Sequence, residues 1–287
     1  MSSQNRRAFL SSLGAAAVSL ATGYTPFGSA AAQLAPRPTK TKLGIQLYTL
    51  RSAASTNLSG TLAQLAAIGY SEIEFAGFHN HPATEVRGML DQYGLAAPSA
   101  HIDIGQIEGA AATATFRDAK TVGLKWITVP SLPGGKRDTV DAWKQVAKQF
   151  NTVAAETRQQ GFRFAYHNHN AELQKVGGAV PLEVLLGETD PALVSFEMDV
   201  YWVVNGGADP LDLLARYPDR FKMLHLKDSK GPPDHTMTDV GSGTIDFKAI
   251  LARAKGVEHF FVEHDQPADP FASAKASYAY LSGIMSA

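Results

Sequence analysis

The 287-residue chain contains no cysteine. Its absence excludes disulfides, cysteine-ligated zinc and a thiol nucleophile, so a bound metal ion would need histidine, aspartate and glutamate as ligands. The chain also lacks an excess of charge, because 26 basic and 27 acidic residues leave a formal net charge of -1. This balance gives no basic field, and the composition therefore predicts no nucleic-acid partner.

Long apolar runs are also missing after the N-terminus, so no later segment is expected to span a bilayer. At the N-terminus, Arg6 and Arg7 precede an alanine-rich apolar stretch and then small residues up to Ala32. This order is typical of an export signal and resembles the twin-arginine type. We expect a signal peptide over 1–32, a tether over 33–41 and a periplasmic or secreted mature protein. A first amphipathic helix of the fold is the alternative for the same stretch.

From Lys42 onward, strand-like and helix-like stretches alternate, with strand centres near residues 45, 73, 98, 127, 164, 196, 224 and 261. Their spacing is roughly 30 residues, the length of a βα unit. Strict alternation favours a parallel sheet with outer helices, and eight units favour closure into a (β/α)8 TIM barrel over 42–287. The alternative is an open doubly wound sheet, but the first strand lacks the glycine fingerprint of a dinucleotide-binding turn.

Several predicted strands finish in residues of the types that commonly bind metal ions. Within the run 221–228, His225 and Lys227 fall on one face, because strand side chains alternate with a period of two. Four other strands also end in such groups: His101, His167, Asp199 and Glu263. The C-terminal strand ends of a TIM barrel meet at one face, where its functional residues lie. We therefore expect these side chains to form one site.

The barrel pattern and these strand ends resemble the sugar phosphate isomerases/epimerases of the xylose isomerase-like barrel superfamily. The most telling pieces are His225-Leu226-Lys227-Asp228 and the stretch 240–247. The resemblance implies one divalent ion, Mn2+ first, with Mg2+, Co2+ or Zn2+ as alternatives. Its expected ligands, after strands five to eight, are His167, Asp199, His225 and Glu263.

The strand-five position departs from the family pattern, because His167 replaces the usual glutamate. Glu172, a few residues on, is the alternative fourth ligand. A metal-bound histidine is a poor proton shuttle, so symmetric two-base epimerisation is disfavoured. Inosose dehydratases of the superfamily also have a histidine-rich end to strand five, similar to Tyr166-His167-Asn168-His169.

The resemblance implies an isomerase or epimerase that removes a proton α to the carbonyl of an unphosphorylated sugar or keto-sugar. The expected catalytic residues are Glu263, Lys227 and His167. Expected substrate contacts are His101, Glu74, Trp202 and His169. One alternative is elimination, by a 3-keto-glycoside lyase or an inosose-dehydratase-like enzyme; another, from a different class, is a periplasmic carbohydrate-binding protein without turnover.

The net charge disfavours an endonuclease of the same superfamily. Gly241 and Gly243 are interpreted as turn residues, with a phosphate cradle as the alternative. The expected partner is a small carbohydrate, with no membrane contact after signal cleavage. The oligomeric state stays open, and a homo-oligomer is compatible with the sequence.

Overall fold

The structure is a computed structural model that describes residues 42–135 and 137–286. The predicted signal peptide (1–32) and tether (33–41) lie outside the described residues, so these assignments and the predicted location remain predictions. Within the described ranges, every helix is too short or too polar to pass through a membrane.

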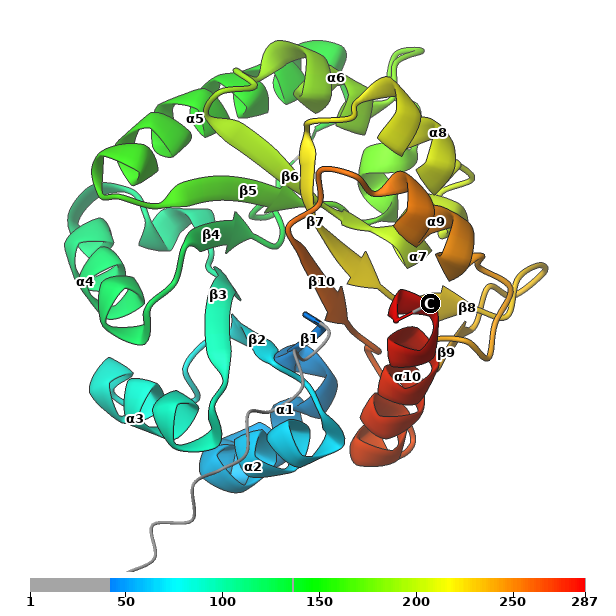
Figure 1. The fold of residues 1–287 in the computed structure, drawn as a ribbon. Helices are drawn as coiled ribbons and strands as arrows, with labels where there is room; N and C mark the ends of the chain where they lie inside the picture. The colour runs from blue at the N-terminus through cyan, green and yellow to red at the C-terminus, as the bar shows by residue number, and fades with distance from the viewer. Residues whose placement is uncertain (1–41, 136, 287) are drawn as a thin grey trace, which may run out of the picture. The chain divides into compact units, whose positions relative to one another are not determined.

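Eight parallel strands close into a barrel in the order β1-β2-β3-β4-β5-β6-β7-β10, with helices around the outside (Figure 1). The predicted eight-stranded TIM barrel is confirmed. The barrel strands are β1 (Gly44–Gln46), β2 (Glu72–Ala76), β3 (Ala96–His101), β4 (Trp126–Val129), β5 (Arg163–His167), β6 (Val194–Asp199), β7 (Phe221–Leu226) and β10 (His259–Val262).

The outer helices begin and end at recognisable residues. The Thr139 hydroxyl accepts a hydrogen bond from the Ala142 amide at the start of the long α5, and Gly69 ends α2 with φ 130°. The helices are α1 (Arg51–Thr56), α2 (Leu58–Ile68), α3 (Ala83–Tyr93), α4 (Ala112–Val122), α5 (Val140–Gln159), α6 (Pro181–Glu188), α7 (Val200–Asn205), α8 (Pro210–Arg216), α9 (Phe247–Arg253) and α10 (Pro270–Met285).

Short elements lie at the C-terminal face, where the sequence predicted only strand ends and loops. The first strand stops at Gln46, because the Gln46 side chain accepts a hydrogen bond from the Tyr48 amide and turns the chain into a 3-10 helix. The 3-10 helices are η1 (Leu47–Leu50), η2 (Ile104–Gln106), η3 (Gly109–Ala111) and η4 (Asn170–Leu173). A small hairpin, β8 (Asp228–Ser229) and β9 (Met237–Thr238), follows β7.

The barrel interior is layered along the strands. Four apolar side chains pack together as one buried layer: Trp126, Ala165, Met223 and Phe261. Two residues further along, on the same inward face, lie Thr128, His167 and His225 within their strands and Glu263 just after the end of β10. The polar layer thus rests on an apolar floor with no access to water, which strengthens the electrostatic interactions above it.

Candidate metal centre

Four ligand-type side chains meet at the C-terminal ends of four neighbouring strands, β5, β6, β7 and β10. His167, Asp199, His225 and Glu263, the quartet, each present one donor atom, and these atoms lie within 4.8 Å of one another. The structure therefore brings together the residues expected to be ligands. Two imidazole nitrogens and two carboxylate oxygens form a donor set that suits a divalent ion.

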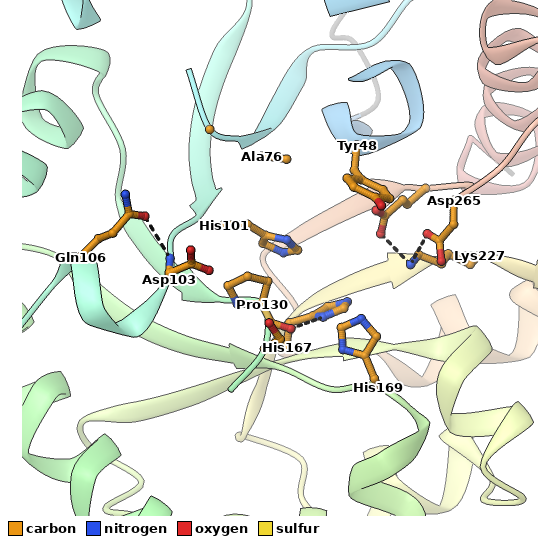
Figure 2. Close-up of a pocket in the computed structure, with 13 residues that line it drawn as sticks. Tyr48, Ala76, His101, Asp103, Gln106, Pro130, His167, His169, Lys227 and Asp265 are labelled. Carbon is orange, nitrogen blue, oxygen red and sulfur yellow. Dashed lines mark hydrogen bonds and ion pairs between the residues drawn. The ribbon is translucent and has the colours of Figure 1, made fainter. Parts of the chain in front are cut away.

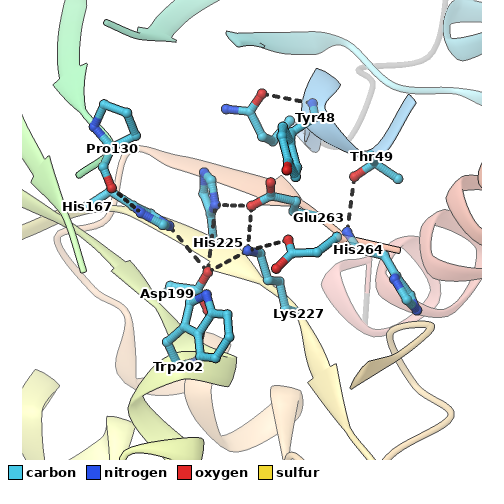
Figure 3. A network of polar contacts seen from close by, with 12 residues as sticks. Tyr48, Thr49, Pro130, His167, Asp199, Trp202, His225, Lys227, Glu263 and His264 are labelled. Atoms are coloured by element: carbon cyan, nitrogen blue, oxygen red, sulfur yellow. Dashed lines mark hydrogen bonds and ion pairs between the residues drawn. The ribbon is translucent and has the colours of Figure 1, made fainter. Parts of the chain in front are cut away.

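The environment of His167 provides a second indication of a cation. Burial, with a smaller effect from His225, lowers the pKa of His167 to about 3, so the imidazole is neutral and carries one hydrogen. Both ring nitrogens nevertheless face acceptors, since Nδ1 lies 3.3 Å from the Pro130 carbonyl oxygen and Nε2 lies 3.3 Å from Asp199 Oδ2 (Figure 3). One of these contacts therefore lacks a hydrogen. A cation between Nε2 and Asp199 would satisfy both atoms, so the residues fit a metal ion.

Lys227 places a permanent positive charge beside the quartet. Its ammonium nitrogen lies 3.0 Å from Asp199 Oδ2, 2.8 Å from Glu263 Oε2 and 2.8 Å from Asp265 Oδ1 (Figure 3). Burial opposes charge on the lysine, but the three carboxylates raise its pKa well above the usual value. Burial also opposes ionisation of Asp199, yet Lys227 and the imidazoles lower its pKa to about 2. Both groups are therefore charged at neutral pH.

His225 lies between the quartet and a deeper pair of carboxylates. Its Nδ1 is 2.7 Å from Glu263 Oε2, whereas its Nε2 is 2.6 Å from Glu74 Oε2 and 3.1 Å from Glu197 Oε2. Burial disfavours the charged form, but Glu197, Glu263 and Glu74 raise the pKa of His225 well above its usual value. The metal-free imidazole therefore carries both hydrogens, and Glu74 fixes the orientation of its ring.

Glu74 was expected to contact substrate, but the structure places it below the cavity with no exposed surface. Its Oε1 accepts a hydrogen bond from Ser99 Oγ at 2.6 Å, and its Oε2 accepts one from Gln46 Nε2 at 2.8 Å. These bonds and the His225 contact occupy the carboxylate, which also forms a second group of possible metal ligands with His101, Glu197 and His225. Its position indicates a supporting role behind His225.

Glu197, which the sequence pattern did not single out, is fully buried on β6. Its Oε2 lies 2.9 Å from His101 Nε2, and its Oε1 has no partner among the described residues. A signal was present, because Glu197 precedes Asp199 by two residues and therefore shares its inward face. The His101 side chain, 11% exposed, lines the cavity above this pair.

A cavity of about 490 Å³ opens above the quartet. His101 lies near its middle, with Tyr48, Lys227 and Asp265 on one side and Asp103 and Gln106 on the other (Figure 2). His167, His169 and Glu263 also line this cavity, whereas Asp199 does not. Of the two quartet carboxylates, only Glu263 can therefore meet a ligand there.

Two other expected site residues stand apart from the cavity. Glu172, the alternative fourth ligand, turns back on its own 3-10 turn: its Oε1 accepts from the Tyr166 hydroxyl at 3.0 Å and its Oε2 from the His169 amide at 2.8 Å. It is therefore not brought to the quartet. The ring centres of Trp202 and His169 are 5.7 Å apart, but Trp202 does not line the cavity. The backbone amide of Trp202 donates a hydrogen bond to Asp199 Oδ1 at 3.0 Å.

The loop containing Gly241 and Gly243 is filled by a carboxylate from the protein itself. Asp228 Oδ2 accepts hydrogen bonds from both glycine amides at 2.9 Å, and Asp228 Oδ1 accepts from Ser229 at 2.8 Å and Ile245 at 3.2 Å. A β-carbon at Gly243 would collide with Asp228. The considered phosphate cradle therefore has its amides already occupied, and the glycines serve the turn.

A closed parallel barrel with a cluster of histidines and carboxylates at its C-terminal strand ends places the protein in the class of TIM barrels that could hold a metal ion at this face. The family model described as "Xylose isomerase-like TIM barrel" matches residues 62–281, and the chain belongs to this family. The sequence-based resemblance to the xylose isomerase-like barrel is thus confirmed at family level.

Curated relatives and solved structures agree with this assignment. The chain is 25% identical over 273 residues to an inosose dehydratase of Geobacillus kaustophilus, covering 78% of this chain and 86% of that protein. It is 30% identical over 169 residues to an inosose dehydratase of Lacticaseibacillus casei, covering 51% and 56%, so the chain spans about half of that relative. A crystal structure of a sugar phosphate isomerase/epimerase from Parabacteroides distasonis has 28% identity, a TM-score of 0.73 and coverage of 86% and 96%.

The IOLI protein, solved with a bound zinc atom, shows the same fold at 15% identity, with a TM-score of 0.68 and coverage of 86% and 98%. The similar proteins thus include both dehydratases and isomerases/epimerases. By their names, the dehydratases match the elimination alternative better than the isomerisation expected first from the sequence.

Proposed function

We propose that the protein is a divalent-metal-dependent lyase that acts on an unphosphorylated keto-sugar or keto-cyclitol by elimination. His167, Asp199, His225 and Glu263 would hold the ion through two nitrogens and two oxygens. A divalent ion in such a site acts as a Lewis acid that polarises a carbonyl and makes the neighbouring C–H bond more acidic. The donor set does not single out one metal, so Mn2+, Zn2+, Co2+ and Mg2+ are all candidates.

The protein's own groups supply the proton transfer. The Glu263 carboxylate faces the cavity and takes the proton from the carbon next to the ketone. The electron pair of that C–H bond forms a carbon–carbon double bond, and the bond to the β-oxygen breaks. The proton taken by Glu263 returns to the departing oxygen, giving water or an alcohol. Lys227, 2.8 Å from Glu263, stabilises negative charge that develops on substrate oxygen.

The single observation that carries this proposal is which two quartet residues line the cavity, His167 and Glu263. Symmetric epimerisation needs a proton carrier on each side of the substrate, but the cavity presents one quartet carboxylate, Glu263, and one neutral imidazole, His167. With one ring nitrogen on the ion and the other facing the Pro130 carbonyl, the His167 imidazole is a poor proton carrier. One base can support proton removal followed by loss of a β-substituent. The match to inosose dehydratases supports the same reaction type.

The loop after β7 supports an unphosphorylated substrate. Asp228 uses the amides that could otherwise bind a phosphate, so this turn offers no anion site. The predicted export points the same way, since sugar phosphates are cytosolic metabolites. Export through the twin-arginine route and a periplasmic location belong to this proposal.

A direct test follows elimination and proton exchange together. A keto-inositol and 3-keto-glucosides are incubated with the protein and each candidate ion in deuterated water, and products are followed by NMR. We expect an unsaturated ketone and released water or alcohol, with loss of at least a hundredfold in rate for Glu263→Gln. The matched control Glu258→Gln removes a carboxylate that pairs with Arg163 outside the cavity and should keep the rate.

Full turnover by Glu263→Gln would refute the proposed base. Exchange without elimination would instead support the isomerase/epimerase interpretation. Binding of the sugars with neither exchange nor elimination would support the carbohydrate-binding protein.

A further inference from the structure

Tyr48 is the one exposed large hydrophobic side chain among the described residues, with 43% of its surface accessible. Its neighbours in η1, Leu47, Thr49 and Leu50, are buried. A single exposed aromatic residue is ordinary on a protein surface. Tyr48, however, lies at the cavity above the quartet and lines the same space as Glu263. Its exposure therefore faces a ligand site.

Two residues close to Tyr48 in the chain, Gln46 before it and Arg51 after it, hold Tyr48 in place. Its amide donates to Gln46 Oε1 at 3.1 Å, which ties the backbone to the buried polar layer. The Arg51 guanidinium lies 4.2 Å from the ring centre and donates to the carbonyl oxygens of Tyr48 at 2.8 Å and Asp265 at 2.7 Å. An aromatic surface fixed in this way loses little conformational entropy when a ligand packs on it.

The cavity extends from His167 and Glu263 to Tyr48 on one side and to Asp103 and Gln106 on the other (Figure 2). Its volume of about 490 Å³ falls in the range of roughly 300–1,000 Å³ that encloses drug-sized ligands. Tyr48 stands on the Asp265 side, away from Asp103 and Gln106 across the cavity (Figure 2). A ring held over His167 and Glu263 would therefore leave space beside Tyr48. The apolar face of a second ring suits that aromatic surface.

We infer that the substrate is a two-ring keto-glycoside, in which the keto-sugar ring lies at the quartet and the ring of the leaving alcohol packs on Tyr48. This inference rests on the proposed elimination and specifies its leaving group as a ring alcohol. Tyr48 then determines specificity without taking part in proton transfer. The aromatic ring of Tyr48, and not its hydroxyl, carries this role.

The test measures binding separately from turnover. Calorimetry with Mn2+-supplemented protein compares phenyl, glucosyl and methyl β-glucosides, which carry no ketone and cannot be eliminated. We expect the wild type to bind the two-ring compounds about tenfold more tightly than the methyl glucoside. Tyr48→Ala should reduce that ratio to about one, and Tyr48→Phe should keep it within about twofold. A wild type without any preference for a second ring would overturn the inference.

A matched control is Tyr217→Ala, because Tyr217 also lies under an arginine, with Arg216 5.2 Å from its ring centre, but does not line the cavity. Its binding ratio should equal that of the wild type, and an equal loss in Tyr217→Ala and Tyr48→Ala would overturn the role of Tyr48.

Turnover of the 3-keto forms distinguishes the two proposals. Ring preference without elimination would refute the proposed lyase and keep the two-ring site. Elimination that is equally fast for methyl and two-ring substrates, in wild type and Tyr48→Ala, would refute the two-ring site and keep the lyase.

Discussion

Replacing Lys227 with methionine removes the ammonium that lies among three carboxylates, those of Asp199, Glu263 and Asp265. The lysine side chain is 2% exposed, so water cannot replace the lost charge. Removing one partner of a buried ion pair typically costs about 3–5 kcal/mol. For a domain of this size, each kcal/mol changes the melting temperature by about 2–4 °C. The metal-free variant should therefore melt about 6–20 °C below the wild type.

Metal addition should stabilise the Lys227→Met variant more than it stabilises the wild type. An ion held by the quartet would face the same Asp199 and Glu263 oxygens that Lys227 contacts, so it supplies the positive charge that the variant has lost. In the wild type, the ammonium opposes that ion by like-charge repulsion. The metal-induced rise in melting temperature should consequently be larger for Lys227→Met, since stabilisation grows with affinity as RT ln(1 + [L]/Kd).

Thermal unfolding followed by circular dichroism, at several concentrations of Mn2+ and Zn2+, measures both effects. The control is Lys222→Met on the same strand, because Lys222 makes no ion pair with the described residues. Unchanged melting of metal-free Lys227→Met, or a metal response no larger than that of the wild type, would show that the charge argument is wrong.

Three further predictions concern the groups around the quartet. Asp228→Asn weakens the charge-assisted bonds to the Gly241 and Gly243 amides, so the free energy of unfolding should fall by about 1.5–3 kcal/mol in chemical denaturation; an unchanged value would contradict the role of this carboxylate. Glu74→Gln weakens the support of His225 and should raise the Kd for Mn2+ or Zn2+ about 10–100-fold by calorimetry, whereas equal affinity would remove Glu74 from that role. The raised pKa of His225 leaves it protonated without metal at neutral pH, so binding must release its Nδ1 proton. Metal affinity should therefore rise with pH, by up to roughly tenfold per unit, and buffers of different ionisation enthalpy should reveal the released proton; flat affinity between pH 6 and 8 would contradict this sign.

Much of the fold was predictable because local patterns and global topology agree. The predicted strand centres fall inside barrel strands, for example residue 98 in β3 and residue 224 in β7, because apolar runs mark the strands. The alignment of strand ends also followed from topology alone, because parallel barrel strands all finish at one face. The meeting of the polar strand ends could therefore be predicted without knowing any side-chain contact.

The parts that were not predicted depend on interactions between distant residues. The early end of the first strand reflects the Gln46 side chain, which bonds both the Tyr48 amide and Glu74. The depth of Glu74 depends on where neighbouring strands place His225 and Ser99, and no single strand pattern contains that information. Likewise, the sequence places Asp228 in a motif at the end of a strand. In the structure, its carboxylate accepts hydrogen bonds from amides 13 and 15 residues further along the chain.

The order of strands around the barrel gives the two halves of the chain different tasks. The whole quartet comes from β5, β6, β7 and β10, which are contiguous, whereas Tyr48, His101 and Gln106 come from segments at or next to β1 and β3. Under the proposed function, substitutions at Tyr48, His101 or Gln106 would change the wall of the cavity while the four quartet residues stay in place. Glu74 on β2, by contrast, bonds His225 directly and ties the N-terminal half to the quartet. In an evolving lineage, such a wall would let substrate choice diversify without replacing the quartet.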